Sequence, residues 1–334
     1  MPHRVEDRVP VIDGCQYCNW SEAIFRELRE GGVDAVLVTV AYHEDFKETV
    51  ANLIDWNAWF ARYPELIMKG LTAADIERAQ MTSRTAVFFG LQTPAPIEDD
   101  IGLVEVLHAL GIRFMQLTYN NQSLLGAGCY EKEDAGITRM GREVIAEMNR
   151  VGMVIDMSHS AERTTRDAIE ISARPIAITH ANPSSWHPAL RNKSDTALKA
   201  LAVRGGMLGL SLYPHHLRGG SACTLADFTA MVERLAETIG VDHIGIGSDL
   251  CQGQPDSVVA WMRNGRWTRA STDIGLGQAV FPPQPSWFRD NRDWGNIRAG
   301  LLARGFSPDD AGKILGGNWR RFFAEGFGMG DKNL

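Results

Sequence analysis

Two histidines and an aspartate each close a short apolar run in the second half of the chain. His159 ends GMVIDMSH, His180 ends RPIAITH and Asp249 ends HIGIGSD. A lone histidine is more often structural than functional, but three such groups at separate strand ends are hard to assign to packing. Imidazole nitrogens and carboxylate oxygens together suit Zn²⁺, Mn²⁺ or Fe²⁺. The pattern predicts a divalent metal on His159 and His180, with Asp249 as a third ligand or as the base that activates water.

Other polar side chains follow further apolar runs near the N-terminus and mid-chain. They are Cys15 and Tyr17 in VIDGCQYC, Gln92 in VFFGLQ and Tyr119 in MQLTYN. The Cys15-x-x-Cys18 spacing is that of a redox pair or of half a zinc site. A redox pair starts a helix, whereas this one follows a strand, and no second Cys/His pair completes a zinc finger. The five cysteines are therefore expected to be free thiols in a reducing cytoplasm.

The elements that must position these groups alternate between strands and helices. Helical periodicity follows a capping Ser21 and a capping Thr138. Near-continuous apolar strands alternating with amphipathic helices favour a parallel sheet covered on both faces. Eight strands favour one closed (β/α)₈ barrel over residues 1–334, because no glycine-rich phosphate loop supports an open dinucleotide-binding sheet. The predicted strands are 9–14, 34–40, 86–92, 112–120, 152–159, 174–180, 205–212 and 243–249.

A barrel gathers the carboxyl ends of its strands at one face, where active sites lie. Tyr213, after the seventh strand, is expected near the mouth of the barrel and in contact with substrate. Residues 251–297 show little periodicity and are rich in tryptophan and proline, so we expect them to form a lid over the same face. Trp267, Trp287, Phe288 and Trp294 in this segment are candidates for an aromatic substrate pocket or, equally, for packing in the core.

Net charge and hydropathy limit the classes of binding partner and the cellular location that we expect. Lys and Arg number 34 against 41 Asp and Glu, giving a net charge of −7, and the basic residues do not cluster. This disfavours a nucleic-acid or anionic-membrane partner. The N-terminal stretch lacks an apolar signal-peptide core, and no apolar run approaches 18 residues, so a cytoplasmic location is expected. Homodimer formation is left open.

The later motifs resemble those of the renal (membrane) dipeptidase family, peptidase M19, within the amidohydrolase-like metal-dependent barrels. The similar stretches are GITRMGREVIAEMNRVGMVIDMSHS, PIAITHANPSSW, LRNKSD, GVDHIGIGSDL and ILGGNWRRFF. The resemblance implies a two-metal site in which His159 and His180 hold the second metal and Asp249 orients the attacking water. It also implies that Arg191 binds the carboxylate of a dipeptide-like substrate.

Four positions depart from the family pattern. Cys15 and Tyr17 stand where the family keeps a His-x-Asp ligand pair, Gln92 replaces a bridging glutamate, and Tyr119 replaces a histidine that contacts the scissile carbonyl. A neutral glutamine bridges two cations poorly, because a carboxylate normally offsets their repulsion. We therefore expect one metal ion, on His159 and His180, with Asp249 or Gln92 and water completing its shell. Cys15 and Tyr17 remain candidate ligands.

Three functions are compatible with these residues. The first is a metal-dependent hydrolase of a small carboxylated amide, specialised rather than a general dipeptidase, in which Tyr119 donates a hydrogen bond to the developing oxyanion. The second is non-hydrolytic chemistry on a small acid, such as decarboxylation, a lyase reaction or iron-dependent oxidation. The third is a binding protein without catalytic activity.

Overall fold

Eight parallel strands close into a barrel, which confirms the predicted (β/α)₈ class. The computed structural model describes residues 8–266 and 278–327. Each barrel strand pairs in parallel with its neighbours in the order β2-β1-β9-β8-β7-β6-β5-β4, and β4 returns to β2 to complete the ring. The strands are β1 (Val11–Gln16), β2 (Val33–Ala41), β3 (Ile67–Lys69), β4 (Thr85–Leu91), β5 (Ile112–Gln116), β6 (Val154–Asp156), β7 (Ala177–Ala181), β8 (Met207–Leu210) and β9 (Ile244–Ile246).

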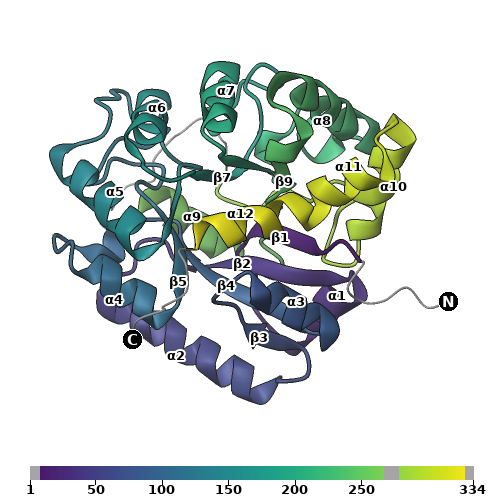
Figure 1. Cartoon of the computed structure of the whole chain (residues 1–334), viewed down its shortest axis with the longest axis horizontal. Coiled ribbons are helices and arrows are strands. Elements are labelled where there is room, and N and C mark those ends of the chain that lie inside the picture. The colour runs from purple at the N-terminus through teal and green to yellow at the C-terminus, as the bar shows by residue number, and fades with distance from the viewer. Residues whose placement is uncertain (1–7, 267–277, 328–334) are drawn as a thin grey trace.

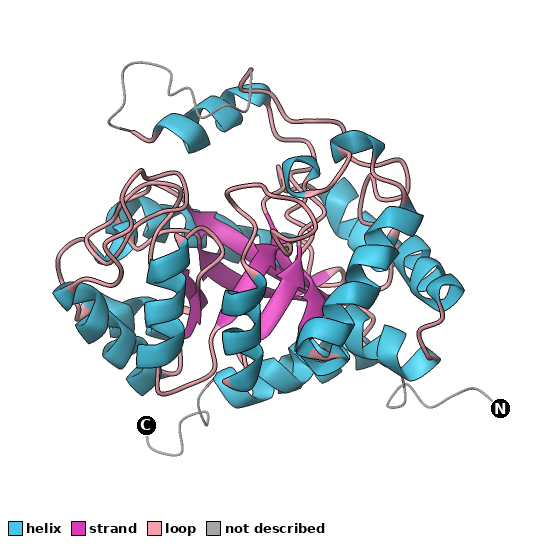
Figure 2. Cartoon of the chain, turned by 90° about the horizontal axis from the view of Figure 1, so that it is seen from above, coloured by secondary structure: helices cyan, strands magenta, loops and turns pink. Residues whose placement is uncertain are grey.

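Helices surround this ring (Figures 1 and 2). The predicted caps are confirmed, since Ser21 Oγ accepts from Ile24 N and Thr138 Oγ1 from Gly141 N. The α-helices are α1 (Glu22–Glu30), α2 (Phe46–Arg62), α3 (Ala74–Met81), α4 (Leu103–Leu110), α5 (Arg139–Val151), α6 (Glu162–Ile171), α7 (Asp195–Val203), α8 (Leu225–Ile239), α9 (Asp256–Asn264), α10 (Trp294–Arg304), α11 (Pro308–Gly312) and α12 (Asn318–Gly326). Short helical turns are η2 (Ala95–Ile97), η3 (Pro214–His216), η4 (Gly220–Ala222), η5 (Val241–His243) and the π-helical η6 (Lys313–Gly317).

One strand was not predicted from the sequence. β3 pairs with the first residues of β4, where Ile67 faces Thr85 and Lys69 faces Val87. A three-residue strand is too short to show the period-2 alternation on which strand prediction depends. It lies beside β4 as an addition to the eight-stranded ring.

The barrel interior is filled from its amino-terminal end by α12, which crosses the ring of strands in Figure 1. Trp319, Phe322 and Phe323 are fully buried with inward-facing strand residues such as Phe88 and Phe114. The Trp319 indole N–H donates to the carbonyl of Ile246 at 2.8 Å. The C-terminal helix α12 therefore supplies the layer of the core at the amino-terminal end of the barrel.

Glycines in the strands make room for the Trp319 ring. A Cβ atom at Gly245 would lie 2.4 Å from the indole nitrogen, and one at Gly14 would lie 2.6 Å from the ring carbon Cζ2. Both distances are far inside van der Waals contact. The absence of side chains at these positions is therefore a requirement of packing.

We expect Gly245→Ala to lower the free energy of unfolding by about 1–3 kcal/mol, because the added methyl overpacks a closed core. Gly295→Ala is the matched control, since a Cβ there meets nothing within 4 Å in α10. Gly295 lies in the first turn of α10, where alanine is at least as compatible with the helix as glycine, so the control should be neutral or slightly stabilising. Chemical denaturation midpoints of the two variants measure the difference, and equal midpoints would contradict the packing argument.

The predicted lid segment contains more regular structure than its sequence indicates. α9 lies within it, and Val259 and Met262 of this helix pack with Tyr42 and Tyr119. Residues 267–277, including the candidate Trp267, lie outside the described residues. That the segment acts as a lid stays a prediction.

Trp287 does not reach the site, contrary to its predicted role as a substrate contact. Its indole N–H donates to the carbonyl of Cys223 at 2.8 Å, and its ring packs on Phe228 of α8. Phe288 and Trp294 stack edge to face nearby. These aromatic side chains are buried in the core between the α8 and α10 regions. Their apolar surface is covered there by neighbouring side chains and does not line a substrate pocket.

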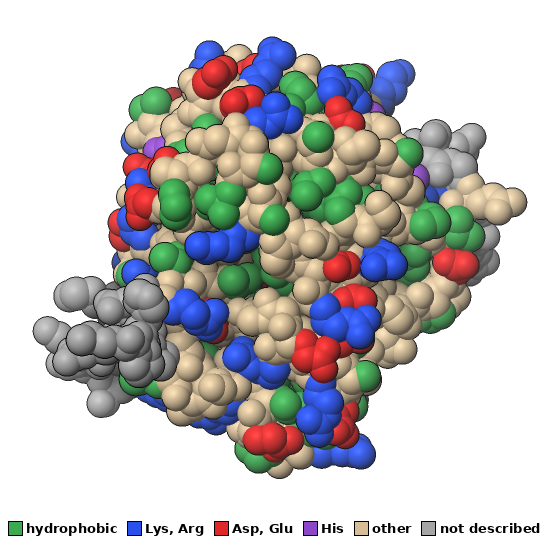
Figure 3. Space-filling model, turned by 90° about the vertical axis from the view of Figure 1, so that its right-hand side faces the viewer, with side chains coloured by type: hydrophobic (Ala, Val, Ile, Leu, Met, Phe, Trp, Pro, Cys, Tyr) green, Lys and Arg blue, Asp and Glu red, His purple; other side chains and the backbone are tan. Residues whose placement is uncertain are grey.

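On the face shown in Figure 3, Lys and Arg side chains are interspersed with Asp and Glu. Among the residues described, no helix combines the length and apolarity needed to cross a bilayer.

Candidate metal centre

His159 and His180 point their ring nitrogens at each other. His180 lies within β7 and His159 in the turn after β6, and both are buried. Their Nε2 atoms are 3.0 Å apart. Each Nδ1 has its own partner, because His159 Nδ1 donates to Asn120 Oδ1 at 2.7 Å and His180 Nδ1 bonds the Thr179 hydroxyl at 2.8 Å.

These partners fix the tautomer of both rings. Asn120 Oδ1 can only accept, so His159 carries its proton on Nδ1. Thr179 donates its hydroxyl proton to Asp156 at 2.6 Å, so its oxygen accepts from His180 Nδ1. Burial and the nearby Arg191 charge also lower the pKa of both histidines, which keeps them neutral. Two unprotonated Nε2 lone pairs therefore face each other, an arrangement that a cation between them would satisfy.

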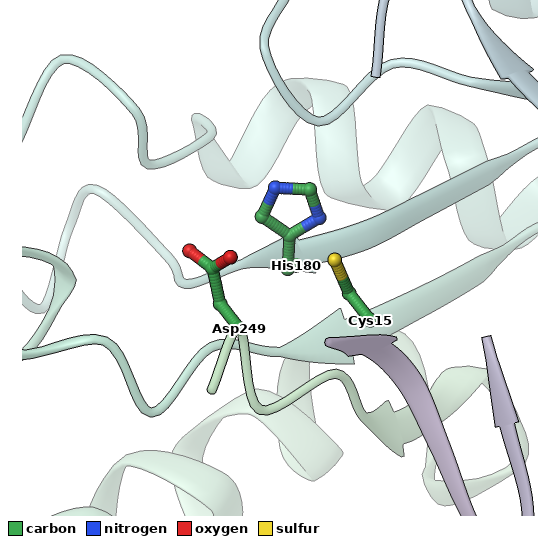
Figure 4. Close-up of side chains that lie close together, drawn as sticks. All are labelled: Cys15, His180 and Asp249. Atoms are coloured by element: carbon green, nitrogen blue, oxygen red, sulfur yellow. The ribbon is translucent and has the colours of Figure 1, made fainter. Parts of the chain in front are cut away.

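Cys15 and Asp249 complete a cluster around His180. Cys15 Sγ, a ring nitrogen of His180 and a carboxylate oxygen of Asp249 all lie within 4.8 Å of one another, and Figure 4 shows the three side chains converging from different strand ends. Asp249 adopts a left-handed backbone with φ +57°, and its N–H donates to the Cys15 carbonyl at 2.9 Å. Burial raises the Asp249 pKa to about 7, while the Arg191 charge opposes the shift. This set of thiol, imidazole and carboxylate donors fits a divalent cation.

A buried aspartate, Asp13, ties the two halves of this cluster together. Its carboxylate accepts from the Ser248 N–H at 2.7 Å and from the side-chain amide of Gln16, also at 2.7 Å. It also accepts from the Ser248 hydroxyl and, at 3.3 Å, from the Cys15 N–H. Burial raises the Asp13 pKa to about 6. Asp13 thus holds the ends of β1 and β9 in the register that brings Cys15 beside Asp249.

The other predicted ligands differ in position. Gln92 lines the cavity, and its Nε2 lies 2.8 Å from Thr39 Oγ1 and 3.4 Å from Cys15 Sγ. Tyr17 does not line the cavity; its ring packs edge to face on Tyr42 with centroids 4.6 Å apart. The β1–β2 register is irregular between Asp13 and Gln16, so the simple alternation that would place Tyr17 beside Cys15 fails.

The substrate-side residues gather above the cluster. The predicted substrate and catalytic residues Tyr119, Arg191 and Tyr213 line the cavity together with Asp249. The Tyr119 ring stacks on His159 with centroids 4.2 Å apart, and burial raises its pKa, so it remains a hydroxyl donor. Arg191 is 3% exposed and donates to the carbonyls of Ser158 and His180.

Sequence reasoning missed three residues with clear structural roles. Asn120 and Thr179 orient the two histidines, and Tyr42 lines the cavity beside Gln92, whose Nε2 is 3.2 Å from the Tyr42 hydroxyl. Asn120 follows Tyr119 and Thr179 precedes His180 in the sequence. Being next to a predicted site residue was the one signal that could have identified them. Asp156 orients His180 indirectly, because its carboxylate accepts from the Thr179 hydroxyl, which in turn bonds His180 Nδ1.

The fold and the cluster together define a (β/α)₈ barrel with a metal-ligating site at the carboxyl ends of its strands. The chain belongs to the membrane dipeptidase family, peptidase family M19, whose profile matches residues 3–262.

Curated relatives agree with this membership. The chain is 25% identical over 269 residues to dipeptidase aclJ of Aspergillus oryzae and 25% identical over 287 residues to dipeptidase tcpJ of Claviceps purpurea. These matches cover 79% and 85% of this chain but 57% and 61% of the relatives, so the chain spans about three-fifths of their length.

Solved structures agree as well. An amidohydrolase from Pseudomonas aeruginosa is 34% identical with a TM-score of 0.91, covering 96% of this chain and 97% of its own. A metallopeptidase from Rhodobacter sphaeroides, solved with a phosphinate mimic of the dipeptide L-Ala-D-Ala, shares the fold at 18% identity. Its TM-score is 0.79, with 96% of this chain and all of that chain covered.

Proposed function

We propose that the protein is a metal-dependent hydrolase that cleaves a small, carboxylate-bearing amide of the dipeptide type. The facing Nε2 atoms of His159 and His180, 3.0 Å apart with both Nδ1 atoms engaged, carry this proposal. Membership in the M19 family supports the hydrolytic reaction. We further propose a specialised substrate rather than general dipeptides, because the Cys15–Gln92 half of the site departs from the pattern that the family resemblance implies.

His159, His180 and Asp249 would hold the metal, with Cys15 as a further donor. When bound, a divalent ion polarises a carbonyl and lowers the pKa of water. Asp249, with its φ of +57°, projects its carboxylate into the cavity, where it can accept a proton from water and pass it to the leaving amine. Tyr119 keeps its phenolic proton and donates to the carbonyl oxygen as negative charge develops there.

Arg191 would bind the substrate carboxylate. Its guanidinium has five N–H donors, and two backbone carbonyls, those of Ser158 and His180, anchor it against the strand ends. A fixed, planar guanidinium suits bidentate binding of a carboxylate. Its place at the cavity wall sets the substrate amide on the side of the histidine pair.

We propose one ion per chain. The carboxylate that would offset repulsion between two cations is replaced by the Gln92 amide, which bonds Thr39 and Cys15 through its nitrogen. Tyr17, the other candidate for the first metal position, packs on Tyr42 instead of lining the cavity.

Metal content and turnover test the proposal together. Protein purified without added metal should contain about one divalent ion per chain by elemental analysis, and the Zn²⁺- or Mn²⁺-loaded protein should cleave members of a panel of dipeptides and N-acyl amino acids. Two tightly bound ions would refute the single-ion site. Stoichiometric metal without cleavage of any panel member would refute the hydrolase.

The uncharged Cys15–Gln92 half of the site is the observation that favours a second candidate, non-hydrolytic chemistry on a small acid. Oxygen consumption that depends on added Fe²⁺, or release of carbon dioxide from a small acid, would support it. A protein that holds no metal and turns over nothing would instead be a binding protein.

A further inference from the structure

A further buried histidine, His216, lines the cavity from the loop after β8. It lies in η3, is 5% exposed and shares the cavity with Arg191 and Asp249. Its Nδ1 is 2.7 Å from the Ser211 hydroxyl, whereas its Nε2 makes no hydrogen bond with any residue that the structure describes. The proposed hydrolytic reaction leaves this ring without a role.

The surroundings of Ser211 decide which nitrogen of His216 carries the proton. Ser211 is fully buried, and its Oγ accepts from the Tyr213 N–H at 3.2 Å. Among the described residues, the one acceptor within reach of the Ser211 hydroxyl proton is His216 Nδ1. A buried hydroxyl proton without an acceptor is costly, so Ser211 donates to Nδ1. His216 therefore carries its own proton on Nε2, the opposite tautomer to that of His159 and His180.

Two asparagines fix the position of the His216 ring. The His216 carbonyl accepts from Asn182 Nδ2 at 3.1 Å and from Asn192 Nδ2 at 3.0 Å, and Asn192 Oδ1 accepts from the Asn182 N–H at 3.0 Å. Asn192 follows Arg191 in the sequence, so η3 is held against the segment that carries the arginine. Burial and the Arg191 charge lower the pKa of His216, which keeps the ring neutral. A fixed, uncharged N–H donor is the result.

Two kinds of donor therefore meet at this wall of the cavity. Arg191 donates to the carbonyls of Ser158 and His180 and keeps further N–H groups for a ligand. His216 adds one N–H without charge. The two oxygens of a carboxylate can accept from both residues, whereas a primary carboxamide has one oxygen and would turn its own NH₂ donor toward one of them.

We propose that His216 is a substrate-binding residue whose Nε2–H donates to the substrate carboxylate that Arg191 binds. This inference rests on the proposed function, because that function places the carboxylate on Arg191. Binding by a guanidinium and an imidazole N–H together selects dipeptide-like substrates whose carboxylate is free over those in which it is converted to an amide.

A pair of phosphinate mimics of an Ala-Ala dipeptide tests this role without turnover. One mimic carries the free carboxylate and the other a primary carboxamide, so the pair differs in charge and hardly in shape. In calorimetric titrations of the metal-loaded protein, His216→Leu should weaken binding of the carboxylate mimic by about 10- to 100-fold, the range expected for a hydrogen bond to a charged group. The carboxamide mimic should lose much less affinity, because its neutral oxygen is the weaker acceptor. His216→Gln, whose side-chain amide offers an N–H in place of Nε2–H, should retain most of the wild-type affinity.

His187→Leu is the matched control. The His187 carbonyl accepts from the same Asn192 amide at 2.9 Å, but this histidine does not line the cavity. Both mimics should bind the control as tightly as they bind the wild type. No loss of affinity in His216→Leu, or an equal loss for the two mimics, would overturn the inference and leave His216 with a structural role in η3.

The tautomer of His216 can be measured directly in the wild type. Long-range ¹H–¹⁵N correlation spectra of the imidazole rings, assigned with His216→Gln, should show the His216 proton on Nε2. Its signal should shift when the carboxylate mimic binds. A proton on Nδ1 would overturn the inference, and this result does not depend on the folding of His216→Leu.

Cleavage of dipeptides separates the two proposals. If a dipeptide is cleaved and His216→Leu changes neither its KM nor the affinity for the carboxylate mimic, the role of His216 is refuted and the hydrolase stands. Carboxylate-selective binding that is lost in His216→Leu, without cleavage of any dipeptide, refutes the hydrolase and leaves the binding role standing. Failure of the wild type to bind the carboxylate mimic would overturn the inference about His216, while cleavage of the substrate panel still decides the hydrolase.

Discussion

Asp249→Asn should reduce kcat/KM for the cleaved panel substrates by about 100- to 10,000-fold, the range expected for loss of a general acid–base group. Asparagine keeps the size of the side chain and, like aspartate, tolerates the left-handed backbone with φ +57° found at this position. The change therefore removes the charge and the proton acceptor while preserving the local fold. Steady-state kinetics at matched metal loading measures the effect.

Metal content of the same variant separates the two roles open to Asp249. A metal ligand loses affinity for the ion on conversion to the amide, whereas a base alone loses activity at unchanged affinity. Asp242→Asn serves as the control, since Asp242, in η5 ahead of β9, pairs with Lys313 of η6 and does not line the cavity. Activity of Asp249→Asn within about threefold of the wild type would contradict any proton-transfer role.

His180→Ala should abolish stable metal binding. The Nε2 lone pairs of His159 and His180 face each other at 3.0 Å, so removing one ring takes away half of the nitrogen donor pair. At a free metal concentration 100 times the dissociation constant, binding raises the free energy of unfolding of the wild type by about 2.7 kcal/mol. This increase should vanish in the variant. Thermal unfolding with and without added Zn²⁺ or Mn²⁺ measures the increase directly.

Two comparison variants are expected to show an intermediate loss and no loss of metal affinity. Asn120→Ala removes the partner of His159 Nδ1 while keeping the ring itself, and should weaken metal binding by about 10- to 100-fold, as is typical for groups that orient a ligand. His187→Ala removes an imidazole that does not line the cavity and should leave metal affinity unchanged. A His180→Ala protein with wild-type affinity would show that the metal binds elsewhere.

The sequence predicted the fold well because its signals are local and repeated. Eight apolar runs alternating with amphipathic helices leave few alternatives to a closed parallel barrel, and the capping residues Ser21 and Thr138 act where they were expected. β3 was not predicted because three residues are too few to show the alternation of a strand. α9 was not predicted because its short amphipathic pattern lies within a segment rich in tryptophan and proline.

The site was predictable to the extent that it depends on strand ends. His159, His180, Asp249 and Cys15 converge because parallel strands of a barrel present their carboxyl ends to one face. The sequence does not show the register irregularity within β1, and in the structure the Tyr17 ring packs on Tyr42 instead of lining the cavity.

The hydrogen bonds that orient the two histidine rings could not be predicted, because they depend on contacts between residues distant in the sequence. Asn120 reaches His159 across 39 residues of sequence, and Asp156 acts on His180 only through the hydroxyl of Thr179. The place of Trp287 was open for a related reason, since an apolar ring suits either a pocket or a core; in the structure its indole N–H donates to the Cys223 carbonyl and its ring packs in the core.

The position of α12 has a consequence for how the chain acquires its structure during synthesis. Trp319 and its neighbours fill the barrel interior, yet they follow every strand in the chain, so a ribosome must complete all nine strands before that layer exists. Until then the apolar inner faces of β1, β4 and β5 have no partner and are open to association with other chains. Nascent chains stalled before residue 318 should therefore depend on chaperones.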